Sequence, residues 1–198
     1  MLIFFDQRLV FLATPKAGST AIEAALGSLA TAVIQRPTLL KHTNADAFAR
    51  FLGPYLQEAA GARFTVTALM REPLAWLGSW YRFGQRDDAI SPARQTRDVT
   101  FDEFVRAWCR ETPPEFAQVG RQSDFLQSGG RLAVDRLFRY EDIDSFVHFL
   151  EDSLDCVITL PRLNVSPDAN MDLSPAAHDL LRRTAAADFA LYDRIGAA

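Results

Sequence analysis

The fold of this chain is decided by residues 9–26, which read LVFLATPKAGSTAIEAAL. The apolar run that opens the stretch is typical of a buried strand, and the Pro and Gly that follow indicate a loop. A helix is expected over 19–30, with Thr20 and Glu23 at the T-x-x-E spacing of a capping box. The stretch therefore predicts a strand, a tight loop and a helix, the repeating unit of an α/β protein.

The rest of the chain continues this alternation. Apolar or β-branched runs predict further strands at 2–5, 64–70 and 136–139. Apolar residues at helical spacing predict helices at 46–60, 74–83, 100–108, 144–154 and 175–193. No repeat or low-complexity linker interrupts the pattern. We therefore expect one domain over 1–198, of the α/β class, with a mostly parallel central sheet.

The balance of charge excludes some partners. The chain has 198 residues, with 21 basic and 25 acidic side chains and a net charge of −4. This acidic balance argues against nucleic acid as a binding partner. Lysine is rare: of the 21 basic residues, only Lys16 and Lys41 are lysines, and the others are arginines. Positive charge is in excess over 1–99 and negative charge over 100–198. This fits a small anionic ligand in the first half, or else chance and solvated helix faces.

Metal, disulfide and membrane signals are lacking in the sequence. Cys109 and Cys156 lie far apart without a CxxC motif, and the histidines show no metal-ligand spacing, so no metal site is expected. No apolar run approaches the roughly 20 residues that a membrane helix needs, and the start of the chain has no basic segment typical of a signal peptide. We expect no transmembrane segment and a cytoplasmic location.

The loop at 14–20 has the chemistry of an anion-binding loop. Free N–H groups and the positive end of the dipole lie at the start of a helix, and Gly18 permits close approach of the backbone. Ser19 and Thr20 add hydroxyl donors, and Lys16 adds a mobile positive charge. Lys16 precedes the glycine, so the loop is not the nucleotide motif GxxxxGK[ST]. A plain strand-to-helix turn is the alternative.

A second strand-to-helix turn, Arg71-Glu72-Pro73, follows the strand at 64–70. Counted along a helix from Arg71, Ser79 lies within about a quarter-turn of the same face. The two side chains would then share one phosphate, because the planar fork of arginine donates to two oxygens at once. For each residue alone, the alternative is a surface ion pair for Arg71 and a helix contact for Ser79. The presence of two such turns favours the anion site.

These motifs resemble the PAPS-dependent sulfotransferases, where PAPS is 3′-phosphoadenosine 5′-phosphosulfate, and specifically a short, bacterial-like member of the carbohydrate-type branch. TPKAGST at 14–20 is similar to the family's 5′-phosphosulfate loop, and REP at 71–73 with SWY at 79–81 to its 3′-phosphate element. LFRYEDI at 137–143 is similar to a strand end of the family, and weaker likenesses lie at 160–166 and 188–192. The resemblance implies a three-layer sandwich with the P-loop-NTPase-like sulfotransferase fold.

The resemblance also implies roles for particular residues. The 5′-phosphate and sulfonate would be held by Lys16, Ala17, Gly18, Ser19 and Thr20. Lys16 would in addition stabilise charge on the leaving phosphate, and Arg71 and Ser79 would hold the 3′-phosphate. His42 would be the catalytic base, since its neutral ring accepts a proton near pH 7. Asp46 and Glu23 are alternatives for the base, and Lys41 is expected to be solvated.

The implied activity is transfer of a sulfonate group from PAPS to a hydroxyl acceptor by in-line displacement, without a metal. The resemblance points to a carbohydrate or glycolipid as acceptor, and residues 84–98 are expected to form its gate. The alternatives are a P-loop-like nucleotide kinase or hydrolase, which would need Mg-ATP, and a non-catalytic nucleotide-binding module. Nothing in the sequence pattern bears on the oligomeric state.

Overall fold

The computed structural model describes residues 1–86, 91–161, 163 and 168–196. The chain forms two compact units, which we describe separately. The first comprises Met1–Arg71, Gln122–Asn164 and Arg194–Ala198, and the second comprises Glu72–Arg121 and Val165–Asp193. The expectation of a single domain stays a prediction.

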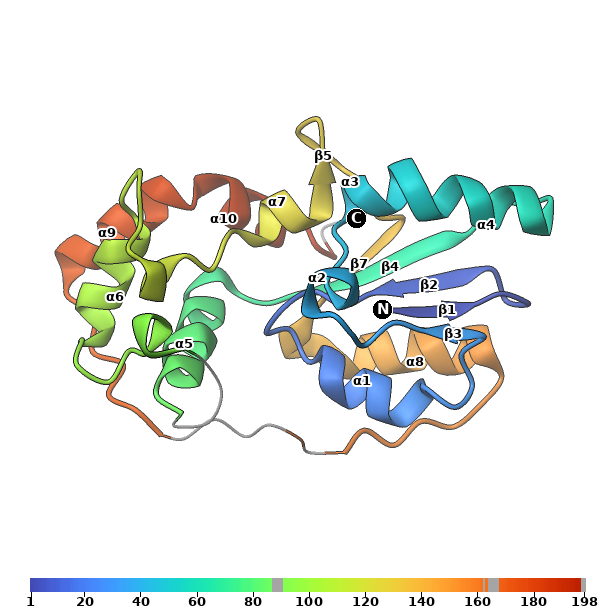
Figure 1. Cartoon of the computed structure of the whole chain (residues 1–198), viewed down its shortest axis with the longest axis horizontal. Helices are drawn as coiled ribbons and strands as arrows, with labels where there is room; N and C mark the ends of the chain where they lie inside the picture. Colours follow the sequence, from blue (N-terminus) through green and yellow to red (C-terminus); the bar gives the residue numbers. More distant parts are fainter. Residues whose placement is uncertain (87–90, 162, 164–167, 197–198) are drawn as a thin grey trace. The chain divides into compact units, whose positions relative to one another are not determined.

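A five-stranded sheet forms the centre of the first unit (Figure 1). In spatial order its strands are β3 (Ala32–Val33), β1 (Leu2–Phe4), β2 (Leu9–Leu12), β4 (Thr65–Met70) and β7 (Arg136–Arg139). The pairs β2–β4 and β4–β7 are parallel, whereas β1 runs antiparallel to both β2 and β3. The α/β class is thus confirmed, but the sheet is mixed, because the short turn between β1 and β2 can only join antiparallel neighbours.

Helices lie on both faces of this sheet (Figure 1). On one face are α1 (Ser19–Leu26) and α8 (Ile143–Leu154), whose buried Ile22, Leu26, Phe146 and Leu150 pack against strand residues such as Phe11 and Leu69. On the other face is α4 (Gly53–Ala60). The remaining elements of the unit are α2 (Thr38–Lys41), α3 (Ala45–Ala47), η1 (Phe48–Leu52), α7 (Gln122–Leu126), β5 (Gln127–Ser128), β6 (Arg131–Leu132) and η4 (Tyr140–Asp142).

Two helix predictions in the first unit need correction. Helix α1 ends at Leu26 rather than near Ala30, and it has no capping box, because Gly18 is its N-cap and makes no side-chain bond. The helix expected over 46–60 contains a π-helical turn, η1, directly before Gly53 and Pro54. Such a turn holds an extra residue and so changes the phase of the apolar positions.

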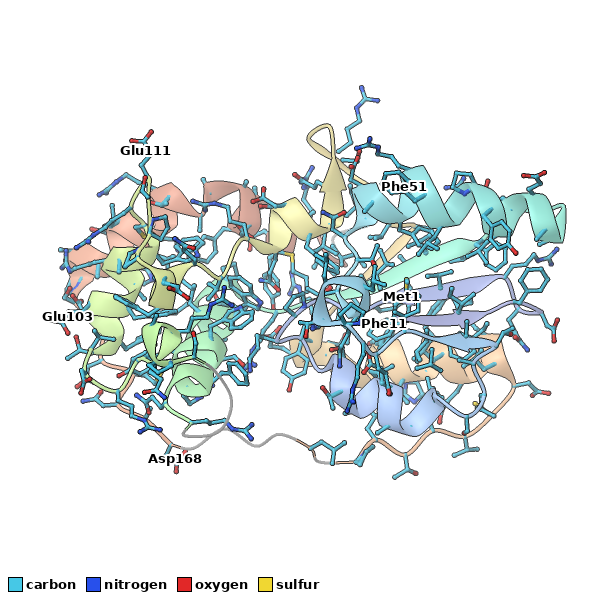
Figure 2. All side chains as sticks on the ribbon, viewed as in Figure 1. Met1, Phe11, Phe51, Glu103, Glu111 and Asp168 are labelled. Atoms are coloured by element: carbon cyan, nitrogen blue, oxygen red, sulfur yellow. The ribbon has the colours of Figure 1, made fainter. Side chains whose placement is uncertain are left out.

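The changed phase decides which aromatic side chains of this helix are buried. Phe48 is buried, whereas Phe51 and Tyr55 are 67% and 69% exposed. In Figure 2, Phe51 lies on the outer side of the first unit, and Met1 and Phe11 lie inside it. The expected apolar stripe along 46–60 is therefore only partly buried.

The second unit is helical. It contains α5 (Pro73–Gly84), η2 (Pro92–Arg94), α6 (Phe101–Trp108), η3 (Glu115–Ala117), α9 (Pro175–Thr184) and α10 (Ala186–Asp193). Its core is rich in aromatic residues, including Trp76, Tyr81, Phe101, Phe104 and Trp108. The carboxylate of Asp102 on α6 accepts hydrogen bonds from the backbone and hydroxyl of Ser174, the N-cap of α9. The helix expected over 175–193 is two helices, since α9 ends at Thr184.

The segment 84–98, the expected acceptor gate, lies in the second unit, and its residues 87–90 are outside the described part. Its far end is anchored on α5: the buried Thr96 donates through its hydroxyl to the carbonyl of Tyr81 at 2.7 Å and through its backbone to the carbonyl of Gly84 at 3.0 Å. Within the described residues, no helix combines the length and the apolar character that crossing a membrane would need.

Candidate functional site

The carboxyl ends of the three parallel strands place the predicted site residues at one edge of the sheet. Loop 13–18 follows β2, Arg71 follows β4 and Tyr140 follows β7. The register aligns Ala68 of β4 with both Leu12 of β2 and Leu137 of β7, so the three exits lie at nearly the same level. Crevices at the carboxyl ends of parallel strands are common ligand sites in α/β folds.

The loop after β2 turns sharply and presents its backbone donors. Lys16 and Gly18 both have left-handed backbone conformations, with φ of 61° and 78°. In the described part of the chain, no acceptor takes a hydrogen bond from the backbone N–H groups of Ala17, Gly18, Ser19 or Thr20. These donors lie at the positive end of the α1 dipole, and such an arrangement binds anions.

Arg71 is held against this loop. Its Nη1 donates to the carbonyl oxygen of Lys16 at 3.5 Å, and its guanidinium lies over the ring of Tyr140, 4.8 Å from the ring centre. The same ring lies close to Gly18: a Cβ added to Gly18 would come within 2.7 Å of Tyr140 Cε2. Arg71, Tyr140 and the loop therefore form one packed group, with the cation stacked on an aromatic face.

Sequence reasoning did not single out Tyr140 as a site residue. It belongs to the LFRYEDI stretch that carried part of the resemblance, but nothing in that pattern links it to Gly18. The signal is its position one residue beyond β7, which becomes informative only once β7 is known to pair with β4.

The backbone of Arg71 is fixed by a side chain from α7. The N–H of Arg71 donates to Gln122 Oε1 at 2.9 Å, and Gln122 Nε2 donates to the Arg71 carbonyl at 2.7 Å. Gln122 is buried and Arg71 is half-buried, and the two bonds satisfy both backbone groups of Arg71. The sequence contained no signal for this contact, because it joins residues that are far apart in the chain.

His42 lies beside the start of the loop. It follows α2, and its Nδ1 is 2.6 Å from the carbonyl oxygen of Ala13, the residue directly after β2. Because a carbonyl can only accept, the neutral ring carries its proton on Nδ1, which leaves the lone pair on Nε2. The Nε2 atom is therefore the basic nitrogen of the ring.

The surroundings of His42 keep the ring neutral. Burial lowers its pKa below the ordinary value of 6.5, and the positive charges of Lys41 and the Met1 ammonium act in the same direction. The hydrogen bond to Ala13 and the charge of Glu23 oppose this shift but are outweighed. A neutral imidazole near pH 7 has the protonation state that a general base needs.

The expectation that Lys41 is solvated is wrong. Its Nζ donates to Glu23 Oε2 at 2.7 Å, and the side chains of Lys41 and Glu23 are only 18% and 3% exposed. The other oxygen of Glu23, Oε1, accepts from the Met1 ammonium at 3.2 Å. Both oxygens of this buried carboxylate thus meet a cation, because an unpaired charge would be costly there. This pairing with two cations, rather than a capping box, explains why a glutamate occupies position 23.

The carboxylates considered as alternative bases are therefore already engaged. Glu23 is neutralised by its two cations. Asp46 accepts a hydrogen bond from the hydroxyl of Ser128 and lies 3.5 Å from Arg50 Nη1. Of the three groups considered, only His42 has a basic atom, Nε2, with no polar contact among the residues that the structure describes.

Ser79 lies in the second unit, whereas Lys16–Thr20, His42 and Arg71 lie in the first. It is buried on α5, which begins at Pro73 with Glu72 as its N-cap. Arg71 is thus not part of that helix, and the argument that placed Arg71 and Ser79 on one helix face is wrong. The structure brings together the predicted site residues of the first unit. A shared role for Ser79 stays a prediction.

The sequence matches no protein-family model, and a search of curated proteins found no match. The residues that the structure describes contain no group of three or more His, Cys, Asp or Glu side chains placed to hold a metal ion.

Proposed function

We propose that this protein is a sulfotransferase that moves a sulfonate group from PAPS to a hydroxyl acceptor. The observation that carries the proposal is the contact of Arg71 with the Lys16 carbonyl, beside the N–H groups of Ala17 to Thr20, which have no acceptor among the residues that the structure describes. Two cationic side chains and a set of unused N–H groups suit a ligand with more than one anionic group, such as a nucleotide bearing phosphates. The three-layer sulfotransferase fold is part of the same proposal.

The proposed chemistry is a single in-line displacement. The acceptor oxygen bonds to sulfur while the bond from sulfur to the 5′-phosphate oxygen breaks, and adenosine 3′,5′-bisphosphate leaves. The acceptor proton passes to Nε2 of His42, whose ring is oriented by the carbonyl of Ala13. Lys16 and the N–H groups of Ala17 to Thr20 stabilise the charge that develops on the leaving phosphate. A preorganised donor of this kind contributes about 3–4 kcal/mol to the barrier reduction.

A sugar hydroxyl, in a polysaccharide, glycolipid or small glycoside, is the acceptor that we propose. The support is the carbohydrate-type resemblance of the sequence together with the neutral imidazole of His42, since an alcohol must lose its proton during transfer. The proposed mechanism uses no metal ion.

Binding is the first test. Adenosine 3′,5′-bisphosphate should bind, as measured by calorimetry, and should raise the thermal midpoint of unfolding. Lys16→Met should weaken this binding. Arg63→Met is a matched control, because Arg63 pairs with Asp135 at the opposite end of β4. Absence of binding, or preferential binding of Mg-ATP, would refute the proposal in favour of a kinase or hydrolase.

Transfer of labelled sulfonate from PAPS to a panel of glycans and glycosides is the second test. His42→Asn should lower kcat by about 10²- to 10⁴-fold, because the amide can still donate to Ala13 but has no basic nitrogen. Nucleotide binding by this variant should be retained. Binding without transfer to any acceptor would point instead to a non-catalytic module.

A further inference from the structure

The candidate base is connected to the helix of the anion loop by a second route besides its hydrogen bond to Ala13. Lys41, the last residue of α2, directly precedes His42 in the chain and binds Glu23 on α1 at 2.7 Å. Helix α1 is the helix whose first turn provides the loop donors. The pair therefore links the segment that carries His42 to the element that carries the anion site.

The linkage is buried and tightly bonded. Besides Lys41, Glu23 binds the Met1 ammonium, and that ammonium also donates to the carbonyl of Lys41 at 3.3 Å and that of Ile34 at 3.1 Å. Side chain and backbone of Lys41 are thus both held, one residue from His42. Buried, hydrogen-bonded ion pairs fix geometry well, because breaking one leaves a charge without compensation.

We propose that Glu23 is a positioning residue for His42, holding the ring beside the anion loop through Lys41. The inference rests on the proposed function for its catalytic meaning, but the placement of the ring is a property of the folded protein alone. Among the described residues, the ring itself makes one polar contact, from Nδ1 to Ala13, and its segment has a short helix with exposed Leu39 and Leu40. The ion pair of Glu23 with Lys41, which we call the clamp, therefore acts on the backbone that carries the ring.

Titration of His42 separates positioning from a simple charge effect. The charged groups that face the ring are Lys41 beside it on the α2 segment, Glu23 from α1 and the Met1 ammonium before β1; the Ala13 carbonyl follows β2. Removing the negative charge of Glu23 in place would lower the pKa of His42 further. Releasing the ring to solvent would instead raise the pKa toward 6.5, because burial is the largest cause of its depression.

The experiment is an NMR titration of the histidine rings in the wild-type protein and Glu23→Gln. We expect the pKa of His42 to rise in the variant, and the ring to change from the Nδ1-protonated tautomer to a mixture. A fall in the pKa with the tautomer retained would overturn the proposal. Asp188→Asn is the matched control, since Asp188 is an equally buried carboxylate near Arg121 in the second unit; it should leave the titration of His42 unchanged.

Two further variants keep the test decisive if Glu23→Gln does not fold. Lys41→Met leaves Glu23 paired with the Met1 ammonium and should also give a mixed tautomer, whereas Lys41→Arg should keep the wild-type tautomer. Retention of the wild-type tautomer in Lys41→Met would contradict the clamp.

Sulfonate transfer then relates the clamp to catalysis. A misplaced base should lower kcat about 10- to 100-fold in Lys41→Met, with little change in the affinity for adenosine 3′,5′-bisphosphate. If the wild type is active and Lys41→Met has the same kcat, the positioning role is overturned and the proposed function stands. An inactive wild type would remove the proposed function, and the tautomer would still decide whether Glu23 places His42.

Discussion

The side-chain amide of Gln122 binds both backbone groups of Arg71, accepting from its N–H at 2.9 Å and donating to its carbonyl at 2.7 Å. At these two residues the chain first leaves the first unit and first returns to it. The contact therefore closes the excursion of the chain through residues 72–121 and fixes the backbone of a candidate ligand residue.

Gln122→Met should destabilise the protein by about 2–4 kcal/mol, because it removes the hydrogen bonds of two partly buried backbone groups while nearly keeping the volume of the side chain. Urea denaturation measures this cost. Gln118→Met is the control, since Gln118 makes a comparable bond to the Pro113 carbonyl at an exposed position, and it should cost less than about 1 kcal/mol. Equal costs for the two variants would contradict the structural role given to Gln122.

Gly18→Ala should be more costly than the same change at Gly61. Both glycines have left-handed φ values, 78° and 61°, so each substitution carries the backbone strain of about 1–2 kcal/mol. At Gly18 the new methyl group would also meet Tyr140 at 2.7 Å, whereas at Gly61 nothing lies within 4 Å. The difference in the free energy of unfolding between the two variants measures this contact. A difference near zero would mean that Tyr140 yields without cost.

Arg71→Lys should weaken the binding of adenosine 3′,5′-bisphosphate by about 10- to 100-fold. An ammonium neither offers a planar fork to phosphate oxygens nor stacks on Tyr140 as the guanidinium does. Calorimetric titration of the variant provides the measurement. Arg63→Lys, at the opposite end of the same strand, should bind as the wild type does. A uniform loss in both variants would indicate a general effect of charge rather than a site at Arg71.

The stability of the protein should decrease as the pH falls below about 6.5, partly through His42. Its pKa is lowered in the fold by burial, so in this range the unfolded chain binds a proton that the folded chain does not. This contribution is fully present above the unfolded pKa and is lost as the pH falls toward the folded value. The thermal midpoint of His42→Asn should therefore change less between about pH 7.5 and 5.5 than that of the wild type. Parallel curves would refute the assignment.

A second pH dependence should arise at lower pH in the second unit. Hydrogen bonds from Ser174 and Arg106 lower the pKa of Asp102 from 3.8 to about 2. A depressed carboxyl pKa gives stability that is present above 3.8 and is lost as the pH falls toward 2. Asp102→Asn should be less stable than the wild type at neutral pH, and the difference should shrink over this range. A constant difference in the denaturation midpoint would contradict the prediction.

The sequence predicted those features that depend on neighbouring residues. The strand, loop and helix at 9–26 follow from local spacing, and so does the turn that places Arg71 at the end of β4. The antiparallel direction of β1 was missed, although the short turn before β2 dictates it. Glu23 was misread because its spacing to Thr20 fits a cap, while its actual cations, Met1 and Lys41, come from segments that the sequence alone could not place nearby.

The site residues that escaped prediction depend on contacts between distant segments. Tyr140 reaches Gly18 and Arg71 only because β7 pairs with β4 in a particular register. In the same way, nothing local links Gln122 to the backbone of Arg71. Arg71 and Ser79 show the converse error, since a helical spacing was applied across the start of α5, where Arg71 is not helical.

The pairing of β7 with β4 has a consequence for the order in which the site forms during synthesis. The ribosome makes the loop at 14–18 and Arg71 early, but β7 and Tyr140 emerge only after the whole segment 72–121 has been translated. A nascent chain that ends before Arg136 has the donors of the loop without the aromatic face on which Arg71 stacks. Anion affinity should therefore appear late, and a bound anion would favour chains whose last strand has already joined the sheet.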